Sequence, residues 1–294
     1  MSSRLKIVFF GTGPVAAGSL ESLVEDFEIE FVVTKARKHS RDSAPVEDLA
    51  VKHGLSLQFA NDKAELDELI ATVEISSKVG VIVDYGVIVS QKVINAFLLG
   101  IVNSHFSLLP EWRGADPITF AILSGQPTTG VSLMLIEPTL DTGKIIVAQP
   151  LPIAPDDTTP TLTDKLVGLS NAMLREYLPQ YIDGKITPRA QENPENATYS
   201  RKLVKSDGDL DPATMTATEC ERRVRAFIGF PRTRLQFMDQ ETIVTGAKIL
   251  PGYDGESWSD VIECADNTFM QITEIINPKS GKKMRVADYL RGLK

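Results

Sequence analysis

The sequence predicts an α/β protein with a mainly parallel sheet in its N-terminal part and a small β-barrel in its C-terminal part. The first observation is that short apolar strands alternate with helical patterns up to His105, which is typical of βαβ units. The second is that short strands separated by frequent turns follow Thr233, which is typical of a small barrel. The chain of 294 residues is long enough for two domains of ordinary size.

The parallel part of the sheet is predicted from short apolar runs. These strands are expected at Lys6–Phe10, Glu30–Thr34, Leu57–Phe59, Val79–Asp84 and Gly100–His105. Helical patterns fill the intervals at Val15–Glu25, Val46–His53, Ala64–Ala71 and Gln91–Phe97. Gly54 follows the second of these helices, as glycine does at many helix C-termini. Because helices separate the strands, the strands are expected to run parallel.

The pattern changes in the following segment. A helix is expected at Pro117–Leu123, because proline suits the first helical turn. Strands expected at Gly130–Glu137 and Lys144–Ala148 are predicted to form a hairpin, since Pro138–Gly143 between them is rich in turn residues. A long amphipathic helix is expected at Thr161–Ile182, where apolar residues recur at helical spacing.

Residues 1–183 are therefore predicted to form one domain and residues 207–294 another. The segment 184–206 between them is rich in proline, asparagine and charge, and it is expected to be a linker. The second domain is predicted to begin with a helix at Thr218–Ala226. Its strands are expected at Arg234–Met238, Glu241–Leu250, Val261–Cys264 and Phe269–Ile276.

The composition is that of a soluble globular protein, with 43% hydrophobic and 24% charged residues. No apolar run approaches the roughly 18 residues of a membrane span, and Lys6–Phe10 is too short for a signal-peptide core. We therefore expect a cytoplasmic protein that does not contact a membrane. Cys220 and Cys264 are far apart in the sequence and lack metal-ligand spacing, so they are expected to be buried structural residues.

Charge is distributed unevenly along the chain. The net charge is −8, which by itself does not indicate a nucleic-acid partner. Residues 201–294, however, hold 15 lysines and arginines against 14 acidic residues. They include two basic clusters, which fit either ordinary surface or contacts with a polyanion: Arg222-Arg223-Arg225 and Lys279-Lys282-Lys283-Arg285.

Three polar residues carry the strongest chemical signal in the sequence. Asn103 and His105 lie two residues apart at the end of a predicted strand, so their side chains point to the same side. A side-chain amide can stabilise an oxyanion while a histidine moves a proton, and Asp141 can hold that histidine or a water. These residues fit an acyl-transfer site, although His105 alone also fits a structural histidine in an apolar strand.

Two further segments admit two interpretations each. The run Gly11–Ala16 has the pattern GxGxxA of a dinucleotide-binding turn, but Pro14 removes an amide and Lys35 stands where an acid would hold a ribose. The alternative is a tight strand-to-helix turn that lines a ligand cleft. The basic run Lys35–Arg41 follows the second strand, and it fits a solvated loop or a phosphate-facing one.

Several of these segments together resemble the signature of the folate-dependent formyltransferases. They are Asn103-Ser104-His105, Ser107-Leu108-Leu109-Pro110, Arg113-Gly114, Leu140-Asp141-Thr142-Gly143, Tyr85-Gly86 and Thr129-Gly130-Val131. The resemblance covers nearly the whole chain. Within the family, the chain is most similar to the members that formylate initiator methionyl-tRNA, and that similarity rests on Ala197–Leu203, Arg225–Phe227, Phe230-Pro231, Gly281–Met284 and Ala287–Leu290.

The resemblance implies a Rossmann-like sheet in the N-terminal domain and an OB-like barrel that binds tRNA in the C-terminal domain. The formyl donor would be 10-formyltetrahydrofolate, and the acceptor would be the α-amino group of methionine on initiator tRNA. Asn103, His105 and Asp141 match the catalytic triplet of the family. The residues expected to contact the folate are Ser107, Leu108, Leu109, Pro110, Tyr85 and Gly86. No metal ion is required, and we expect a monomer.

The tRNA would contact basic residues in both domains. The N-terminal set is Lys35, Arg37, Lys38 and Arg41, in a segment shorter than the corresponding basic loop of the family. The C-terminal set is Arg222, Arg223, Lys282 and Lys283. The shortened loop leaves room for a relative that formylates an amino sugar nucleotide. A non-catalytic RNA-binding protein is a third alternative, and the intact triplet argues against it.

Overall fold

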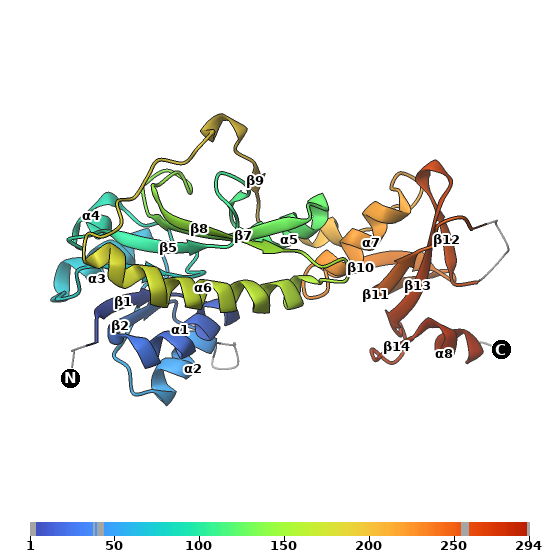
Figure 1. Cartoon of the computed structure of the whole chain (residues 1–294). Helices are drawn as coiled ribbons and strands as arrows, with labels where there is room; N and C mark the ends of the chain where they lie inside the picture. The colour runs from blue at the N-terminus through green and yellow to red at the C-terminus, as the bar shows by residue number, and fades with distance from the viewer. Residues whose placement is uncertain (1–3, 38, 40–43, 254–258, 293–294) are drawn as a thin grey trace. The chain divides into compact units, whose positions relative to one another are not determined.

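The structure is a computed structural model that describes residues 4–37, 39, 44–253 and 259–292 (Figure 1). The chain divides into two compact units. The first comprises Met1–Pro117, Thr128–Pro152 and Thr163–Ser200, and the second comprises Ile118–Pro127, Ile153–Leu162 and Arg201–Lys294. Within the described ranges, no helix combines the length and the apolar character needed to cross a membrane.

A seven-stranded sheet forms the centre of the first unit. Its strands in spatial order are β3 (Leu57–Phe59), β2 (Glu28–Thr34), β1 (Lys6–Phe10), β4 (Gly80–Ile82), β5 (Ile101–His105), β7 (Thr128–Leu135) and β8 (Ile145–Pro152). The strands from β3 to β5 are parallel, whereas β7 is antiparallel both to β5 and to β8. The predicted mainly parallel sheet and its antiparallel hairpin are thereby confirmed.

Helices follow the strands where the alternating pattern predicts them. They are α1 (Pro14–Asp26), α2 (Pro45–Lys52), α3 (Lys63–Thr72), α4 (Gln91–Asn95), α5 (Pro117–Ser124) and α6 (Thr159–Ile182). The Asp62 side chain begins α3 by accepting hydrogen bonds from the amides of Ala64 and Glu65. Ser90 accepts one from the amide of Val93 at the start of α4. Such caps stabilise a helix by about 1 kcal/mol each.

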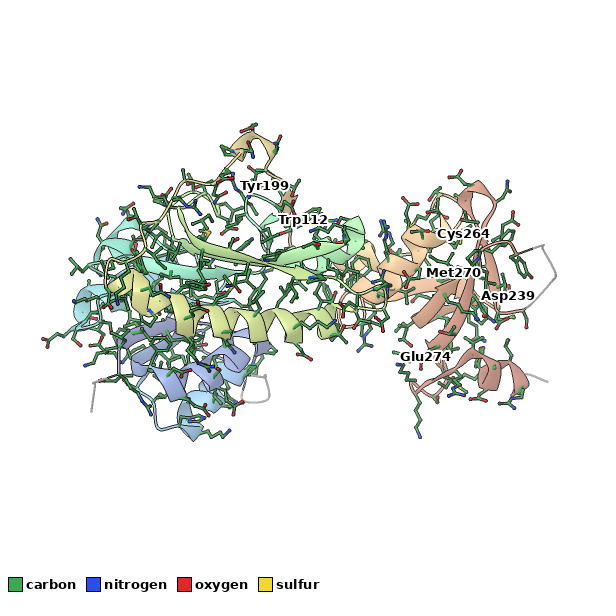
Figure 2. The ribbon with its side chains drawn as sticks, viewed as in Figure 1. Trp112, Tyr199, Asp239, Cys264, Met270 and Glu274 are labelled. Atoms are coloured by element: carbon green, nitrogen blue, oxygen red, sulfur yellow. The ribbon has the colours of Figure 1, made fainter. Side chains whose placement is uncertain are left out.

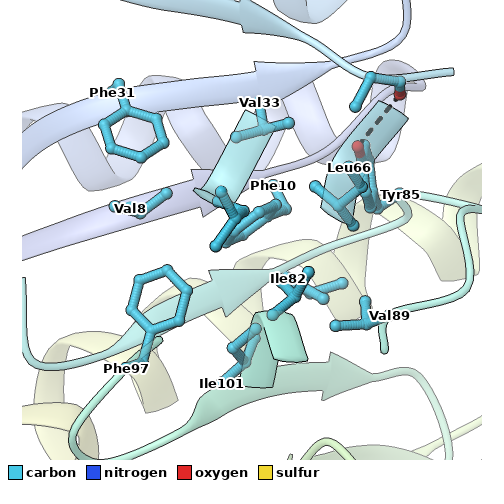
Figure 3. Close-up of a cluster of buried hydrophobic side chains, with 13 residues drawn as sticks. Val8, Phe10, Phe31, Val33, Leu66, Ile82, Tyr85, Val89, Phe97 and Ile101 are labelled. Carbon is cyan, nitrogen blue, oxygen red and sulfur yellow. Dashed lines mark hydrogen bonds between the residues drawn. The ribbon is translucent and has the colours of Figure 1, made fainter. Parts of the chain in front are cut away.

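The hydrophobic core on one face of the sheet contains alternate residues of the central strands (Figure 3). Val8 and Phe10 of β1 pack there with side chains from α3 and from the segment that includes α4, because strand side chains alternate between faces. Ile101 of β5 lies on the same face. On the opposite face, the Ser104 hydroxyl is 2.7 Å from that of Ser170 in α6. Ile101, Asn103 and His105 therefore project away from α6.

The sheet reverses its winding direction between β1 and β4, since the chain passes from β1 to β2 on one side and returns to β4 on the other. Open α/β sheets bind ligands at such a switch point, beyond the carboxyl ends of the strands. Here the Thr12 amide donates a hydrogen bond to the carbonyl of Asp84 at 3.0 Å. The Thr12 hydroxyl donates to the carbonyl of Tyr85 at 2.9 Å. The glycine-containing turn after β1 is thus hydrogen-bonded to the turn after β4.

The second unit contains an antiparallel curled sheet. Its elements are α7 (Ala217–Ala226), β10 (Thr233–Phe237), β11 (Gln240–Ile249), β12 (Val261–Cys264), β13 (Thr268–Ile276), β14 (Lys283–Arg285) and α8 (Val286–Arg291). The spatial order is β10-β11-β13-β12, and β14 pairs with β13. This half-barrel is consistent with the predicted OB-like domain.

The two cysteines of the chain meet inside the second unit. Cys220 of α7 and Cys264 of β12 are both buried, as predicted, and belong to one hydrophobic cluster. Their thiols donate to the carbonyls of Met215 and Ile262 at 4.0 and 3.8 Å. Contact with Cys264, together with burial, raises the pKa of Cys220. Their separation in the sequence gave no sign of this contact, because it arises from packing of the helix against the sheet.

Candidate active site

The carboxyl end of β5 places Asn103 and His105 side by side on one face of the sheet, as the two-residue spacing predicts. The antiparallel neighbour β7 sets His105 opposite Ser132. This edge of the sheet lies within the first unit and includes the loop after β5 and the turn before β8. The polar residues at this edge therefore form the candidate active site.

His105 is 5% exposed and has contacts on both ring nitrogens. Its Nε2 atom lies 3.0 Å from the carbonyl oxygen of Trp112, and its Nδ1 atom lies 4.0 Å from Oδ2 of Asp141. Because a carbonyl can only accept a hydrogen bond, Nε2 carries the proton in the neutral ring. Burial lowers the pKa of His105, and the opposing effects of Asp141 and the Trp112 carbonyl are smaller. The neutral ring thus presents a lone pair on Nδ1.

Asp141 is held by backbone contacts. Its Oδ2 atom accepts a hydrogen bond from the amide of Gly114 at 2.7 Å, and its carbonyl accepts one from Nε2 of Gln191 at 2.7 Å. Asp141 adopts a left-handed backbone conformation with φ of 50°. A side chain at Gly143 would place its Cβ 1.7 Å from the carbonyl of Leu135, so the turn requires glycine there. These contacts direct the carboxylate toward His105.

A buried arginine supports the turn that carries Asp141 through hydrogen bonds to Gln191. Arg113 is 5% exposed, and its Nε and Nη2 atoms donate to Oε1 of Gln191 at 3.2 and 2.6 Å. The amide nitrogen of Gln191 also donates to the carbonyl of Gly143 at 3.0 Å. Gln191 therefore connects Arg113 to the turn that carries Asp141. It lies in the segment expected to be a linker, where the sequence pattern gives no sign of such a contact.

The Trp112 carbonyl is positioned by a short strand pairing. The amide of Trp112, which has φ of 54°, donates to Oγ1 of Thr198 at 2.8 Å. The next residues form β6 (Arg113–Gly114), which pairs in parallel with β9 (Tyr199–Ser200). Figure 2 shows Trp112 and Tyr199 at this pairing. Sequence reasoning placed Arg113-Gly114 in the family signature, but it did not identify the Trp112 carbonyl or the Gly114 amide, because these are backbone atoms.

The Asn103 side chain differs from its neighbours in having no hydrogen-bond partner among the described residues. It is half-buried at the sheet edge, beside the buried His105. An amide nitrogen that is not bound within the protein can donate to an oxyanion without first breaking a protein contact. Asn103 and His105 together can thus stabilise charge and move a proton at one carbonyl carbon.

The loop predicted to contact folate is held by hydrogen bonds within itself and to β7. The Ser107 hydroxyl donates to the carbonyl of Glu111 at 2.5 Å. The Ser132 hydroxyl donates to the carbonyl of Ser107 at 2.7 Å and accepts from the amide of Leu109 at 3.1 Å. Leu108 packs so closely on Gly130 that a Cβ there would lie 2.6 Å from it. Pro110 follows a cis peptide bond and completes this loop.

Tyr85 and Gly86 follow the end of β4, and they differ in burial: Tyr85 is buried and Gly86 is exposed. The Tyr85 ring is buried in the core of Figure 3, and its hydroxyl donates to the carbonyl of Ala60 at 3.1 Å. Burial raises the pKa of this phenol. Gly86 is exposed, and its carbonyl accepts a hydrogen bond from Nζ of Lys35 at 2.9 Å. The Tyr85 ring therefore belongs to the core, and its backbone faces the switch point.

Most of the described basic residues expected to bind tRNA already have a partner within the protein. Lys38 and Arg41 lie outside the described residues, whereas Lys35 binds Gly86 as above. Arg37 pairs with Glu47 and Asp48 at 3.1 and 2.7 Å, and these carboxylates raise its pKa. In the second unit, the contacts are Arg222 to the Ser124 carbonyl, Arg223 to the Asp207 carbonyl and Lys283 to the Glu274 carboxylate.

Lys282 is the remaining member of the second set. It is exposed, and its ammonium group has no partner among the residues that the structure describes. In the same described ranges, no group of three or more His, Cys, Asp and Glu side chains has an arrangement that could hold a metal ion.

Comparisons with known proteins agree with this geometry. Residues 5–178 match the family model described as formyl transferase. The methionyl-tRNA formyltransferase of Halorhodospira halophila is 34% identical over 301 residues, which cover 98% of this chain and 96% of the relative. That of Nitrosospira multiformis is 35% identical over 301 residues with the same coverage of both chains.

Solved structures show the same fold at lower identity. An N-formyltransferase from Helicobacter canadensis, in complex with folinic acid and dTDP-3-aminofucose, superposes with a TM-score of 0.71 at 19% identity and covers 91% of this chain and 98% of its own. HypX from Aquifex aeolicus, in complex with tetrahydrofolic acid, gives a TM-score of 0.66 at 15% identity and covers 98% of this chain and 47% of its own. From the family match and the full-length relatives, this chain belongs to the formyl transferase family.

Proposed function

We propose that this protein transfers the formyl group of 10-formyltetrahydrofolate to the α-amino group of methionyl initiator tRNA, for translation initiation. The observation that carries the proposal is the meeting of Asn103, His105 and Asp141 at one sheet edge of a formyl transferase. The relatives named methionyl-tRNA formyltransferase match both units of the chain, which supports tRNA as the acceptor.

The residues of the site suit direct transfer through a tetrahedral intermediate. The acceptor amine attacks the formyl carbon, and the Asn103 amide stabilises the oxyanion that forms. His105 takes a proton from the attacking nitrogen on its Nδ1 lone pair, and Asp141 stabilises the resulting imidazolium. His105 then returns this proton to N10 of the leaving folate, either directly or through a water. The carbon–N10 bond breaks as N10 receives the proton.

The remaining site residues have binding roles in this proposal. Folate contacts the loop Ser107–Pro110 and the backbone at Tyr85-Gly86, which lie at the carboxyl ends of β5 and β4. The tRNA contacts the basic residues of both units, and among the described ones Lys282 is exposed and has no partner within the described residues. We further propose that the protein works as a cytoplasmic monomer without a metal ion, with domains at 1–183 and 207–294.

A formyl-transfer assay distinguishes this function from its alternatives. With 10-formyltetrahydrofolate as donor, we expect formylation of methionyl initiator tRNA and much slower formylation of an amino sugar nucleotide. The reverse preference would assign the protein to sugar nucleotides. Binding of tRNA without any formyl transfer would indicate a non-catalytic RNA-binding protein. The variant His105→Ala serves as the control, because general acid–base catalysis contributes roughly 10²–10⁴ in rate.

A further inference from the structure

Asp84 lies at the carboxyl end of β4, beside the end of β5. The last paired residues of these strands are Ile82 and Asn103, and Asp84 and His105 each follow two residues later. The carbonyl of Asp84 accepts a hydrogen bond from the amide of Thr12 at 3.0 Å, which fixes it at the switch point. An acidic residue therefore follows the strand that neighbours the one ending at the proposed catalytic histidine, and nothing in the mechanism above uses it.

The carboxylate of Asp84 faces the turn after β1. Its Oδ2 atom lies 2.5 Å from the position that a Cβ on Gly13 would occupy, so the turn has room for the carboxylate because residue 13 is glycine. The backbone of Asp84 is left-handed, with φ of 45°. Among the described residues, none forms a hydrogen bond or an ion pair with this carboxylate. Asp84 is exposed by its surface area, so a ligand can reach its carboxylate.

Two charged groups from different segments act on Asp84. Asp116 acts on it from the loop that also supplies the Gly114 amide to Asp141, and Lys35 acts from the end of β2. Partial burial at the sheet edge is the largest influence and raises the pKa of Asp84, as does the negative charge of Asp116. Lys35 opposes this shift. The carboxylate is thus a stronger base than an ordinary aspartate.

Formyl transfer to an amine that arrives as an ammonium ion removes two protons from one nitrogen. His105 carries one of them from the attacking nitrogen to N10, and its ring has a single open nitrogen for this purpose. The other proton must leave before the attack, because an ammonium nitrogen has no lone pair. It needs a base near the formyl carbon that also reaches solvent, where the proton is finally released.

We propose that Asp84 accepts this first proton from the ammonium form of the acceptor. The ammonium nitrogen gives a proton to an Asp84 carboxylate oxygen and becomes a neutral amine, which then attacks the formyl carbon. Asp84 releases its proton to solvent after transfer, so the cycle consumes no further reactant. This role rests on the proposed function, since it requires an amine acceptor at this edge of the sheet.

The test is the pH dependence of kcat/KM for methionyl initiator tRNA at saturating formyl donor. An α-amino group titrates near pH 8, so above about pH 9 the amine needs no base. We expect Asp84→Asn to lower kcat/KM by roughly 10²-fold at pH 6.5 and to recover toward the wild-type value at pH 9. The KM for the donor should not change. Glu176→Gln removes an exposed carboxylate from α6 in the same way and should leave the profile unchanged.

Asp116→Asn supplies a second, independent readout. Removing the negative charge of Asp116 lowers the pKa of Asp84, so the acid limb of the profile should move to lower pH while activity at neutral pH remains. An Asp84→Asn loss that is equal at pH 6.5 and pH 9, or a changed donor KM, would overturn the proposal. Circular dichroism of each variant reports its folding. A wild-type protein that formylates no amine would contradict the proposed function instead, so the two failures are distinguishable.

Discussion

The Nε2 atom of His105 lies 3.0 Å from the carbonyl oxygen of Trp112. This contact fixes the neutral ring as the Nε2-protonated tautomer and leaves Nδ1 open on the side of Asp141. A proton that arrives on Nδ1 produces an imidazolium held between a carbonyl and a carboxylate. Asp141, 4.0 Å away, therefore acts after the proton transfer more strongly than before it.

The first prediction concerns the protonation of His105. Because burial lowers its pKa, His105 should be neutral and protonated on Nε2 at pH 7, with its midpoint below the ordinary value of about 6.5. The unfolded chain then binds the proton more tightly than the folded one. The free energy of unfolding should therefore rise as the pH rises from the folded midpoint of His105 to the unfolded one, and it should decrease as the pH falls through the same range. Nitrogen-15 NMR of the histidine ring measures the tautomer and midpoint, and a midpoint above 7 would contradict the assignment.

The second prediction is that Asn103→Ala separates activity from stability. The Asn103 amide has no hydrogen-bond partner among the described residues, so its removal should change the free energy of unfolding by less than about 1 kcal/mol. Loss of an oxyanion donor typically lowers kcat by roughly 10²–10³. Thermal unfolding and steady-state kinetics of the same preparation test both parts. Near-normal turnover would remove Asn103 from the catalytic set.

Much of the fold was predictable because periodicity reports burial. The apolar run Lys6–Phe10 and the helical spacing in Thr161–Ile182 each predicted an element that the structure contains, at bounds equal to or within two residues of the prediction. α8 was not predicted as a helix, since its two buried residues, Val286 and Tyr289, give only a single helical repeat. Patterns of side chains identify which face an element buries, and they carry little information about very short elements.

The candidate site was predictable only where side chains perform the chemistry. Asn103, His105 and Asp141 were identifiable as amide, imidazole and carboxylate. The Trp112 carbonyl and the Gly114 amide were not, because every residue has these groups and only the folded backbone aims them. Gln191 is 50 residues from Asp141 in the sequence, and its contact with that residue depends on how the segment after α6 returns to the sheet.

The third prediction makes Gln191 a positioning residue for Asp141. Gln191→Met removes both hydrogen bonds to the turn and leaves Arg113 buried without its acceptor, which should destabilise the protein by about 3 kcal/mol. kcat should fall as Asp141 loses its orientation, with a smaller change in the donor KM. Gln191→Glu is the matched variant: it keeps an acceptor for Arg113 but cannot donate to the turn. Its melting temperature should fall less than that of Gln191→Met, while its kcat should be as low. A normal kcat in both variants would show that the turn orients Asp141 unaided.

The fourth prediction compares two cations that differ in their contacts. The Lys282 ammonium group is exposed without a partner among the described residues, whereas Arg37 pairs with Glu47 and Asp48. If Lys282 contacts a tRNA phosphate, Lys282→Ala should weaken tRNA binding and reduce the slope of log affinity against log salt by about 1. Arg37→Ala should change that slope less, because its charge is already neutralised within the protein. Filter binding across a salt series measures both slopes. Equal slopes for wild type and Lys282→Ala would place the phosphate contacts elsewhere, and a larger effect for Arg37→Ala would mean that tRNA displaces the carboxylates of α2.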